Sequence, residues 1–442
     1  MLKYFRALMA LPGRAAAHIR LLRQDPERFG RNLLQFTDFA LYEKRLIDVM
    51  NAVPMHVAID SKASVSPHLN VLDSAFTRSG MTGGPNTVVN LALRIARLGV
   101  PMRLVATVDT STLDPAWFRA HAKQLIGDVN LPDVAIVSAA DAMRPLVVSP
   151  YDVFLATHWT TAQQLKAVLP RMAVRQFFYM LQEFEPAFYA WSSNYARALE
   201  TYGLDFWPIF NESLLAEYML GQDVGRLGDP ALRERATIFE PAVEERLFRP
   251  PAQRDAGRPK RLLFYARPTN TRNMFGLGLM ALRLASADAA FAEWEFLAIG
   301  GRGSVPPMAL GSGHILKPGA WMDYEGYANS LRQADVLLCP MLSPHTSYPV
   351  LEMAATGGLS VTNTFANKTR ASLASLSDNI VAAEPTVEAL AAGLIAAAER
   401  INAGYPRTAS IRMARNWEVT LDPAAERLAG LFDILSSLRS PI

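Results

Sequence analysis

The sequence predicts an α/β protein in which two doubly wound domains follow an N-terminal helical arm. Three observations lead to this prediction. At 442 residues the chain is too long for a single hydrophobic core. From about Met55 onwards, short apolar runs alternate with amphipathic helical segments, which is typical of parallel sheets covered by helices. The alternation is interrupted by a segment rich in proline and charge, residues 239–261, which we interpret as a linker.

The arm, residues 1–50, is amphipathic and basic. Within residues 1–36, seven basic side chains are set against two acidic ones, a net charge of +5, whereas the whole chain carries only +3. Such a segment either packs on the body of the protein or lies on an anionic membrane leaflet. The rest of the chain is close to neutral, so a global charge of the kind that binds nucleic acid is absent.

Cysteine content and hydropathy indicate the compartment. Cys339 is the only cysteine and lies in an apolar run, which excludes a disulfide framework and a cysteine-based metal site. The sequence contains no apolar stretch near the ~20 residues that span a bilayer. We therefore expect a cytoplasmic protein whose arm would meet the inner face of the plasma membrane if it binds lipid.

The first domain, residues 51–245, should contain alternating strands and helices. Apolar runs predict strands over residues 56–60, 102–107, 134–139, 152–158, 177–181 and 205–210. The first of these should open the sheet, and residues 70–76 should follow it. An amphipathic helix is expected over residues 87–99, ending at Gly99. Another is expected over residues 211–220, with Asn211 as its N-cap.

The second domain, residues 246–420, repeats the alternation. Strands are predicted over residues 261–266, 295–301, 336–341 and 359–363, and helices over residues 274–285, 323–334 and 349–357. A last helical pattern over residues 423–439 has no strand after it. We expect residues 421–442 to form a C-terminal helix that crosses back to the first domain.

Ligands of doubly wound sheets bind where strand ends lead into helix N-termini. One such loop, Arg78–Thr87, contains Gly80, Gly83 and Gly84 in front of a helix. Glycines let backbone N–H groups approach an anion, although a plain flexible loop would have the same composition. The loop matches neither the dinucleotide nor the P-loop pattern.

Two further loops carry charged side chains. Arg267 and Arg272 follow a predicted strand, with no acid nearby in the sequence, and two guanidinium groups suit a diphosphate. Surface arginines are the alternative. Glu352 is the only acidic residue of Leu337–Asn363 and lies about one turn inside a predicted helix. It either complements the helix dipole or serves a ligand, and the polar, proline-fixed loop before it favours a ligand.

Three segments together carry a resemblance to a known family: residues 177–202, 265–276 and 341–368. The chain resembles GT-B glycosyltransferases of family 4 and, more narrowly, rhamnosyltransferases of the WsaF type, whose loop Ser-Pro-His-x-Ser-Tyr-Pro-x-Leu-Glu it contains. Arg267 and Arg272 hold the spacing of the family's Arg and Lys, and Glu352 holds the second glutamate of its E-x7-E motif. Pro344 occupies the place of the first glutamate, and Glu244 stands where the family linker has Asp.

This resemblance implies two Rossmann-like domains facing a cleft, with the acceptor on the first and the nucleotide sugar on the second. It implies a retaining, metal-independent transfer of L-rhamnose from dTDP-β-L-rhamnose to a bacterial surface polysaccharide or its lipid-linked precursor, with no cofactor beyond the donor. The donor phosphate would accept the incoming proton. Arg267 and Arg272 would hold the diphosphate, Glu352 would accept hydrogen bonds from the nucleoside sugar, and Tyr348 would contact the nucleotide.

The same resemblance completes the set of candidate residues. The donor side would include Gly83, Gly84, Asn273, Lys317, Ser347 and Tyr348. On the acceptor side we expect Glu183 and Glu185, which precede the aromatic residues Phe188, Tyr189 and Trp191, and also His158. A buried structural turn and a satisfied core histidine are the alternatives there.

Two other functions stay open at this point. The first alternative is a transferase that uses a different nucleotide sugar, such as a UDP-hexose. A few loop side chains are enough to change the donor sugar within one family. A non-catalytic scaffold or glycan-binding module is the alternative from another class. The retained Arg267, Arg272 and Glu352 argue against it. The sequence also contains no Asp-x-Asp pair, so we expect no metal.

Overall fold

The computed structural model describes residues 55–437, apart from residues 61–65, 79, 82, 109–113, 128–129, 222, 252–256, 302–304 and 321. The predicted arm over residues 1–50, and the membrane contact predicted for residues 1–36, lie outside the described residues. Residues 54–442 form one compact unit that contains both doubly wound domains.

The first domain is built on a parallel sheet that, within the described residues, has seven strands in the order β4-β3-β2-β6-β7-β8-β9. Its strands are β2 (Leu69–Asp73), β3 (Met102–Ala106), β4 (Ala135–Ser138), β6 (Val153–Ala156), β7 (Phe177–Leu181), β8 (Phe206–Asn211) and β9 (Thr237–Phe239). The central strands are buried on both faces, which explains why they appear in the sequence as continuous apolar runs.

Helices cover both faces of this sheet. They are α4 (Gly84–Arg97), α5 (Pro115–Ile126), α6 (Trp159–Val168), α7 (Ser193–Thr201), α8 (Ser213–Gly221) and α9 (Pro230–Glu234). Helix α4 starts directly after Gly83, whose φ of 53° suits a residue without a side chain. One core lies under α4 and α5, and a second core lies on the opposite face, under α6 and α8.

The second domain repeats the arrangement, with the strand order β12-β13-β11-β10-β14-β15-β16 among the described residues. Its strands are β10 (Lys260–Tyr265), β11 (Trp294–Ile299), β12 (Met308–Ala309), β13 (Ile315–Pro318), β14 (Val336–Leu338), β15 (Leu359–Asn363) and β16 (Ile380–Ala383). All of these strands are parallel except β12. The prediction of two doubly wound α/β domains is therefore confirmed.

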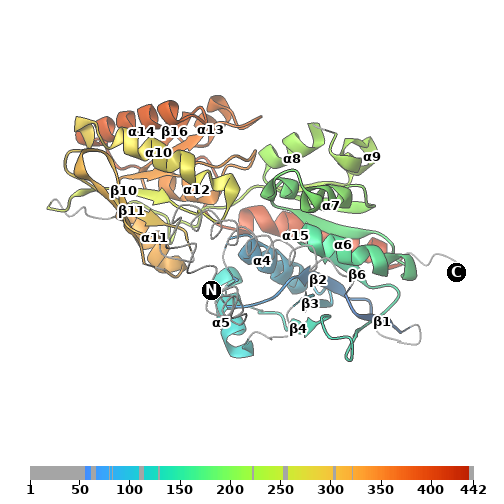
Figure 1. Cartoon of the computed structure of the whole chain (residues 1–442). Coiled ribbons are helices and arrows are strands. Elements are labelled where there is room, and N and C mark those ends of the chain that lie inside the picture. The colour runs from blue at the N-terminus through green and yellow to red at the C-terminus, as the bar shows by residue number, and fades with distance from the viewer. Residues whose placement is uncertain are drawn as a thin grey trace, which may run out of the picture. The chain divides into compact units, whose positions relative to one another are not determined.

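The helices of the second domain also lie on two faces. They are α10 (Phe275–Ala285), α11 (Tyr324–Arg332), α12 (Tyr348–Ala355), α13 (Arg370–Leu376) and α14 (Val387–Asn402). Figure 1 shows α10 and α14 on one side of the sheet and α11 on the other. The last helix, α15 (Glu418–Ser437), packs beside α4, and its Leu421, Leu428 and Phe432 belong to the core of the first domain.

Two local predictions were wrong. Residues 56–60 do contain a strand, β1 (Val57–Ile59), but it pairs with β5 (Leu146–Val148) in a separate small sheet, and β2 opens the main sheet instead. Asn211 does not cap α8. It is the last residue of β8, and its side chain amide donates to groups outside that helix.

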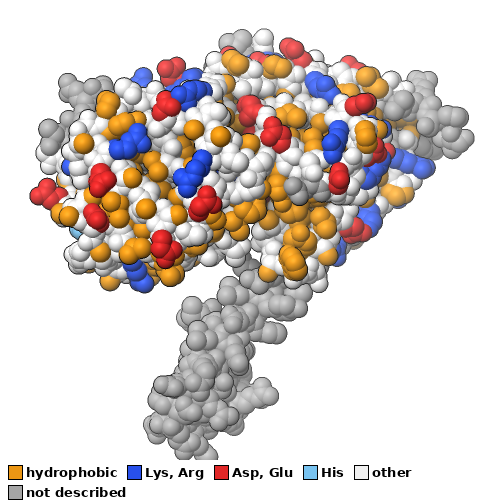
Figure 2. Space-filling view, turned by 90° about the horizontal axis from the view of Figure 1, so that it is seen from above, with side chains coloured by type: hydrophobic (Ala, Val, Ile, Leu, Met, Phe, Trp, Pro, Cys, Tyr) orange, Lys and Arg blue, Asp and Glu red, His pale blue; other side chains and the backbone are white. Residues whose placement is uncertain are grey.

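One face of the described residues can be inspected for its charge. On the face shown in Figure 2, basic and acidic side chains are interspersed with apolar ones. This agrees with the near-neutral sequence of the body. Across the described residues, no helix is both long and apolar enough to cross a membrane.

Candidate active site

The strand order of each sheet reverses beside its first strand, between β2 and β6 in the first domain and between β10 and β14 in the second. At such a switch point the loops diverge and leave room for a ligand at the carboxyl ends of the strands. The loop after β6 contains His158, and the loop after β10 contains Arg267 and Arg272. The loop after β14 leads to Ser347 and Tyr348 at the start of α12.

Contacts between the two domains bring these loops together. Arg272 Nη1 lies 2.9 Å from Glu183 Oε2 of the first domain. The hydroxyl of Ser343 donates to the other oxygen of Glu183. Asn211 Nδ2 donates to the hydroxyl of Tyr348 over 2.6 Å. Predicted donor-side and acceptor-side residues thus meet at one place.

Arg272 is largely buried, with 19% of its side chain exposed. Its guanidinium lies over the ring of Phe188, 4.6 Å from the ring centre. Although Glu183 is close, the N–H of Nη1 is not aligned with its carboxylate, and neither Nε nor Nη1 has a hydrogen-bond acceptor. Buried donors without acceptors are costly, so this group is suited to binding an anion.

Arg267 and Asn273 belong to the same connection between β10 and α10 as Arg272. Arg267 is half-buried beside Tyr265, and no carboxylate of the described residues lies within ion-pair distance of it. Asn273 is buried at the end of a short 3-10 helix, η4 (Thr271–Asn273), and its Oδ1 has no hydrogen-bond donor. Within the described residues, these side chains add a cation without a carboxylate partner and an acceptor oxygen without a donor.

Glu352 is buried on α12, and its carboxylate faces two tyrosines. Tyr327 donates to Oε2 over 2.7 Å, and Tyr324 donates to Oε1 over 3.4 Å. Burial raises the pKa of Glu352 to about 7, although the two phenols act to lower it. Each oxygen keeps a lone pair for a ligand hydroxyl, and Tyr324, which is 47% exposed, marks the side open to solvent.

Tyr348 is bound to the first domain. The hydroxyl of Tyr348 accepts a hydrogen bond from Asn211. Burial raises the pKa of this hydroxyl. Asn211 also donates to Oε1 of Gln182. The amide nitrogen of Gln182 in turn donates to the carbonyl of Gly84. A side chain at Gly84 would have its Cβ 3.2 Å from Gln182. The glycine loop therefore lies against this contact between the domains.

His158 and Glu185 form a pair at the base of the acceptor side. His158 caps α6, and its ring stacks on Phe188 with the ring centres 6.1 Å apart. Its Nε2 lies 3.7 Å from Glu185 Oε1, while Glu185 Oε2 accepts a hydrogen bond from the backbone N–H of Trp159. Burial lowers the pKa of His158 to about 4 and raises that of Glu185 to about 8. Near neutral pH the imidazole is uncharged and the carboxyl is mostly protonated.

Lys317 pairs with a carboxylate on the surface, so the structure gives its assignment to the donor site no support. It is on β13, where Leu316 faces the core, and its side chain is 60% exposed. Its nearest carboxylate is Glu295, at 3.9 Å, which is also paired with Arg261. Alternation of side chains along the strand directs Lys317 to this surface pair.

Three buried polar residues of the site were not predicted. Glu212 follows Asn211 and reaches the loop before α12. Ser343 binds Glu183, and the fully buried Lys368 donates from Nζ to the carbonyl of Met341 over 2.9 Å. Burial lowers the pKa of Lys368 to about 8. Glu212 and Ser343 lie just beyond buried strands, so a stricter search of strand ends would have found them.

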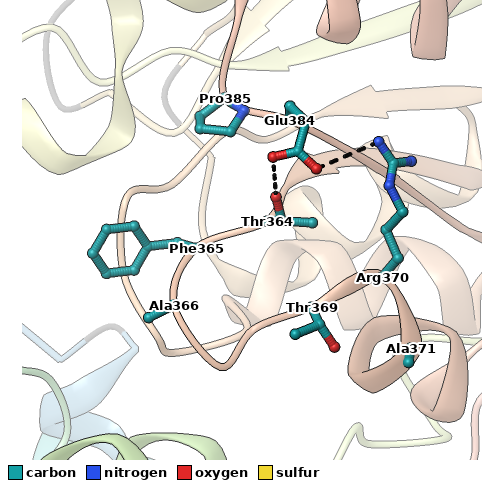
Figure 3. Close-up of a pocket in the computed structure, with 8 residues that line it drawn as sticks. All are labelled: Thr364, Phe365, Ala366, Thr369, Arg370, Ala371, Glu384 and Pro385. Carbon is teal, nitrogen blue, oxygen red and sulfur yellow. Dashed lines mark hydrogen bonds and ion pairs between the residues drawn. The ribbon is translucent and has the colours of Figure 1, made fainter. Parts of the chain in front are cut away.

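A hollow of about 570 Å³ is lined by residues that follow β15 and β16. None of the candidate residues lines it. Figure 3 shows Glu384 between the hydroxyl of Thr364 and the guanidinium of Arg370, while the ring of Phe365 points away. The lining residues are Thr364, Phe365, Ala366, Thr369, Arg370, Ala371, Glu384 and Pro385. Since its charged groups pair with one another, the hollow is not part of the proposed site.

The architecture is that of GT-B glycosyltransferases. The chain is similar to sucrose-phosphate synthase from Thermosynechococcus elongatus, with a TM-score of 0.52 and 15% identity over 84% of this chain and 96% of that one. It is also similar to HepE of Anabaena, solved in complex with UDP-glucose, with a TM-score of 0.52 and 14% identity over 84% and 98% of the two chains. At these identities the likeness establishes the fold alone.

Sequence comparison gives the family. Residues 68–212 match the N-terminal domain of WsaF, and residues 260–395 match its C-terminal domain. Together these matches cover more than half of the chain, which belongs to the WsaF family. Among curated proteins, it is 36% identical over 282 residues to the O-antigen biosynthesis protein RfbC of Myxococcus xanthus. The match covers 61% of this chain but only 20% of that protein.

Proposed function

We propose that this protein is a retaining glycosyltransferase that moves L-rhamnose from dTDP-β-L-rhamnose to a bacterial surface glycan. The observation that carries the proposal is the group of unmade polar contacts at the second switch point. Arg272 has buried N–H groups without acceptors, and Arg267 has no carboxylate partner among the described residues. A diphosphate would supply acceptors for these N–H groups and a negative charge for Arg267, and it would replace Glu183 beside Arg272.

The chemistry follows from where charge develops. As the bond between the anomeric carbon and the phosphate oxygen breaks, negative charge grows on the diphosphate, and Arg267 and Arg272 stabilise it. The acceptor oxygen bonds to the anomeric carbon on the same face, and its proton passes to the departing phosphate oxygen. Glu183 is engaged by Arg272 and Ser343, and Glu185 is mostly protonated near neutral pH, which supports a route without a protein nucleophile.

The family and its relative support the choice of acceptor. The resemblance to WsaF-type enzymes implies rhamnose as the transferred sugar, and the name of the Myxococcus xanthus relative refers to O-antigen biosynthesis. We therefore infer that the acceptor is a growing surface polysaccharide or its lipid-linked precursor. In this proposal Glu183, Phe188 and His158 face the acceptor, and Glu352 holds the sugar of the nucleoside.

The test is transfer with a defined donor. Purified protein incubated with dTDP-β-L-rhamnose and a rhamnan oligosaccharide should release dTDP and form a product whose anomeric configuration, read by NMR, is that of the donor. Activity should survive EDTA, since arginines serve the leaving group. An inverted product, or activity that disappears with EDTA and returns with Mg²⁺, would contradict the proposed mechanism. Binding of dTDP without turnover in any acceptor mixture would favour a glycan-binding module.

A further inference from the structure

We propose that Glu212 is a positioning residue which, together with His345, fixes the loop Ser343–Ser347 and thereby the start of α12. The inference rests on the proposed function, since α12 carries Glu352. Glu212 lies at the end of β8 in the first domain, and the loop belongs to the second. A residue of one domain would thus set the geometry of the donor site in the other.

The backbone of Glu212 is firmly held. Its N–H donates to the carbonyl of Phe239 over 3.1 Å, and its carbonyl accepts from Ala216 over 3.1 Å. Glu212 has a φ of 89°, in the left-handed region that a non-glycine residue rarely adopts, and its side chain is almost completely buried. Such a conformation persists where the surroundings fix it, and it commonly marks functional positions.

The side chain of Glu212 crosses to the second domain. Its Oε1 accepts two hydrogen bonds from Thr346, over 2.7 Å from the backbone N–H and over 2.9 Å from the hydroxyl. Its Oε2 lies 3.8 Å from Nε2 of His345. One carboxylate therefore holds two consecutive residues of the loop.

His345 extends this contact to the helix. Its Nδ1 accepts a hydrogen bond from the backbone N–H of Ser347 over 3.0 Å. In the neutral imidazole Nε2 then carries the proton and faces the carboxylate of Glu212. Ser347 has a φ of 81° and no side chain cap contact, so the imidazole is the group that secures its strained N–H.

The position of the donor site depends on this arrangement. Ser347 directly precedes α12, and Glu352 lies one turn further along. Ser343, at the other end of the loop, donates to Glu183. Within the described residues, the carboxylate of Glu212 contacts Thr346 and His345 and none of the candidate donor groups, so we infer that it acts on the reaction by orienting this loop.

The experiment compares Glu212→Ala and Glu212→Gln with Glu240→Gln as the matched control. Glu240 is a neighbouring carboxylate that binds Ser213 at the start of α8 instead of the loop. In Glu212→Ala, amide hydrogen exchange at Thr346 and Ser347 in the ligand-free protein should rise roughly tenfold or more, because Thr346 loses its acceptor and His345, which accepts from Ser347, loses the carboxylate that faces its ring. Glu212→Gln keeps an acceptor oxygen, so its exchange rates should lie between those of the wild type and those of Glu212→Ala. The control should match the wild type.

The kinetic readout separates positioning from mere stability. Glu212→Ala should raise the KM for donor roughly tenfold with a smaller change in kcat, and Glu212→Gln should restore part of the loss. If Glu212→Ala does not fold, Thr346→Val provides a second test, because it removes the hydroxyl that donates to Glu212. Exchange and KM should change in the same direction in this variant. Unchanged exchange and unchanged KM in the folded variants would overturn the proposal. Exchange needs no substrate, so it tests the inference even if the protein proves to use another donor.

Discussion

Glu183 and Arg272 lie 2.9 Å apart although they follow strands of different sheets, β7 and β10. The carboxylate therefore lies beside the guanidinium, at a position that a phosphate oxygen of the donor would take in the proposed function. The contact is close but not aligned, and Ser343 holds the second oxygen of Glu183. In the proposed function, Arg272 therefore takes part both in donor binding and in the contact between the domains.

Replacing Glu183 should therefore strengthen nucleotide binding. In Glu183→Gln, Arg272 loses its negative partner, and we expect dTDP affinity to rise roughly tenfold, a free energy of about 1.4 kcal/mol. Calorimetry at pH 7 would measure it. The matched control is Glu185→Gln, because Glu185 is mostly protonated at this pH and the substitution changes little charge. An affinity equal to or below the wild type would show that Glu183 does not compete with the diphosphate.

Loss of either arginine should have the opposite effect. Arg267→Ala and Arg272→Ala should each weaken dTDP binding by about 1.5–3 kcal/mol, the range of charge-assisted hydrogen bonds. Lys317→Ala should leave the affinity unchanged, because Lys317 pairs with Glu295 on the surface. If Lys317→Ala weakened binding as much as the arginine variants, the placement of the donor at this switch point would be wrong.

Donor affinity should depend on the ionisation of Glu352. Its pKa of about 7 predicts that the charged acceptor forms as the pH rises through that value, so dTDP should bind more tightly at pH 8 than at pH 6. Ionisation of the ligand phosphate changes the affinity of the wild type and of Glu352→Gln alike. The difference between wild type and Glu352→Gln isolates the carboxylate, and parallel pH profiles of the two proteins would rule out its role.

The same pKa shift has a consequence for stability, with a definite sign. The folded protein binds a proton on Glu352 between its ordinary pKa of 4.5 and about 7, so this group stabilises the fold at low pH and loses that contribution as the pH rises to about 7. Glu185 acts in the same direction up to about pH 8. The melting temperature of Glu352→Gln should therefore fall less than that of the wild type between pH 5 and 8. An equal fall would mean that Glu352 is not buried as described.

The strands and the strand-end residues that the sequence predicted all depend on a local pattern. Buried parallel strands give apolar runs, and a polar residue after such a run, as at Arg267, lies at the edge where ligands bind. Asn211 was misread because Asn before a helical segment is a common N-cap, and its partner Tyr348 comes from the other domain. The pair of Glu183 and Arg272, and the surface position of Lys317, depend on tertiary contacts that no local pattern records.

The basic arm should govern location instead of chemistry. With a net charge of +5 over residues 1–36, it should add about 1 kcal/mol of binding per basic residue near an anionic surface. Deleting residues 1–36 should abolish salt-sensitive sedimentation with phosphatidylserine vesicles while leaving turnover of a soluble acceptor intact. Neutral vesicles are the control. If the deletion variant is insoluble, the arm packs on the body, and the membrane proposal fails.

The preference for one nucleotide should follow from the number of hydrogen bonds that Glu352 can still accept. Tyr327 and Tyr324 already donate to Glu352, one to each oxygen, which reduces the number of hydrogen bonds that the carboxylate can accept from a ligand. A deoxyribose offers only its 3′-hydroxyl, whereas a ribose offers two. Pro344 also replaces the upstream glutamate of the family motif, which removes a second acceptor from the loop.

We therefore expect dTDP to raise the melting temperature more than UDP, GDP or ADP at equal concentration, since a ligand that binds only the folded state stabilises it according to its affinity. Comparing dTDP with dUDP and UDP separates the effect of the base methyl group from that of the 2′-hydroxyl. In Glu352→Gln the preference for dUDP over UDP should shrink, because the charged acceptor that distinguishes them is gone. A larger shift with UDP than with dTDP in the wild type would exclude dTDP-rhamnose as the preferred donor and leave the broader assignment as a glycosyltransferase to be tested with UDP-sugars.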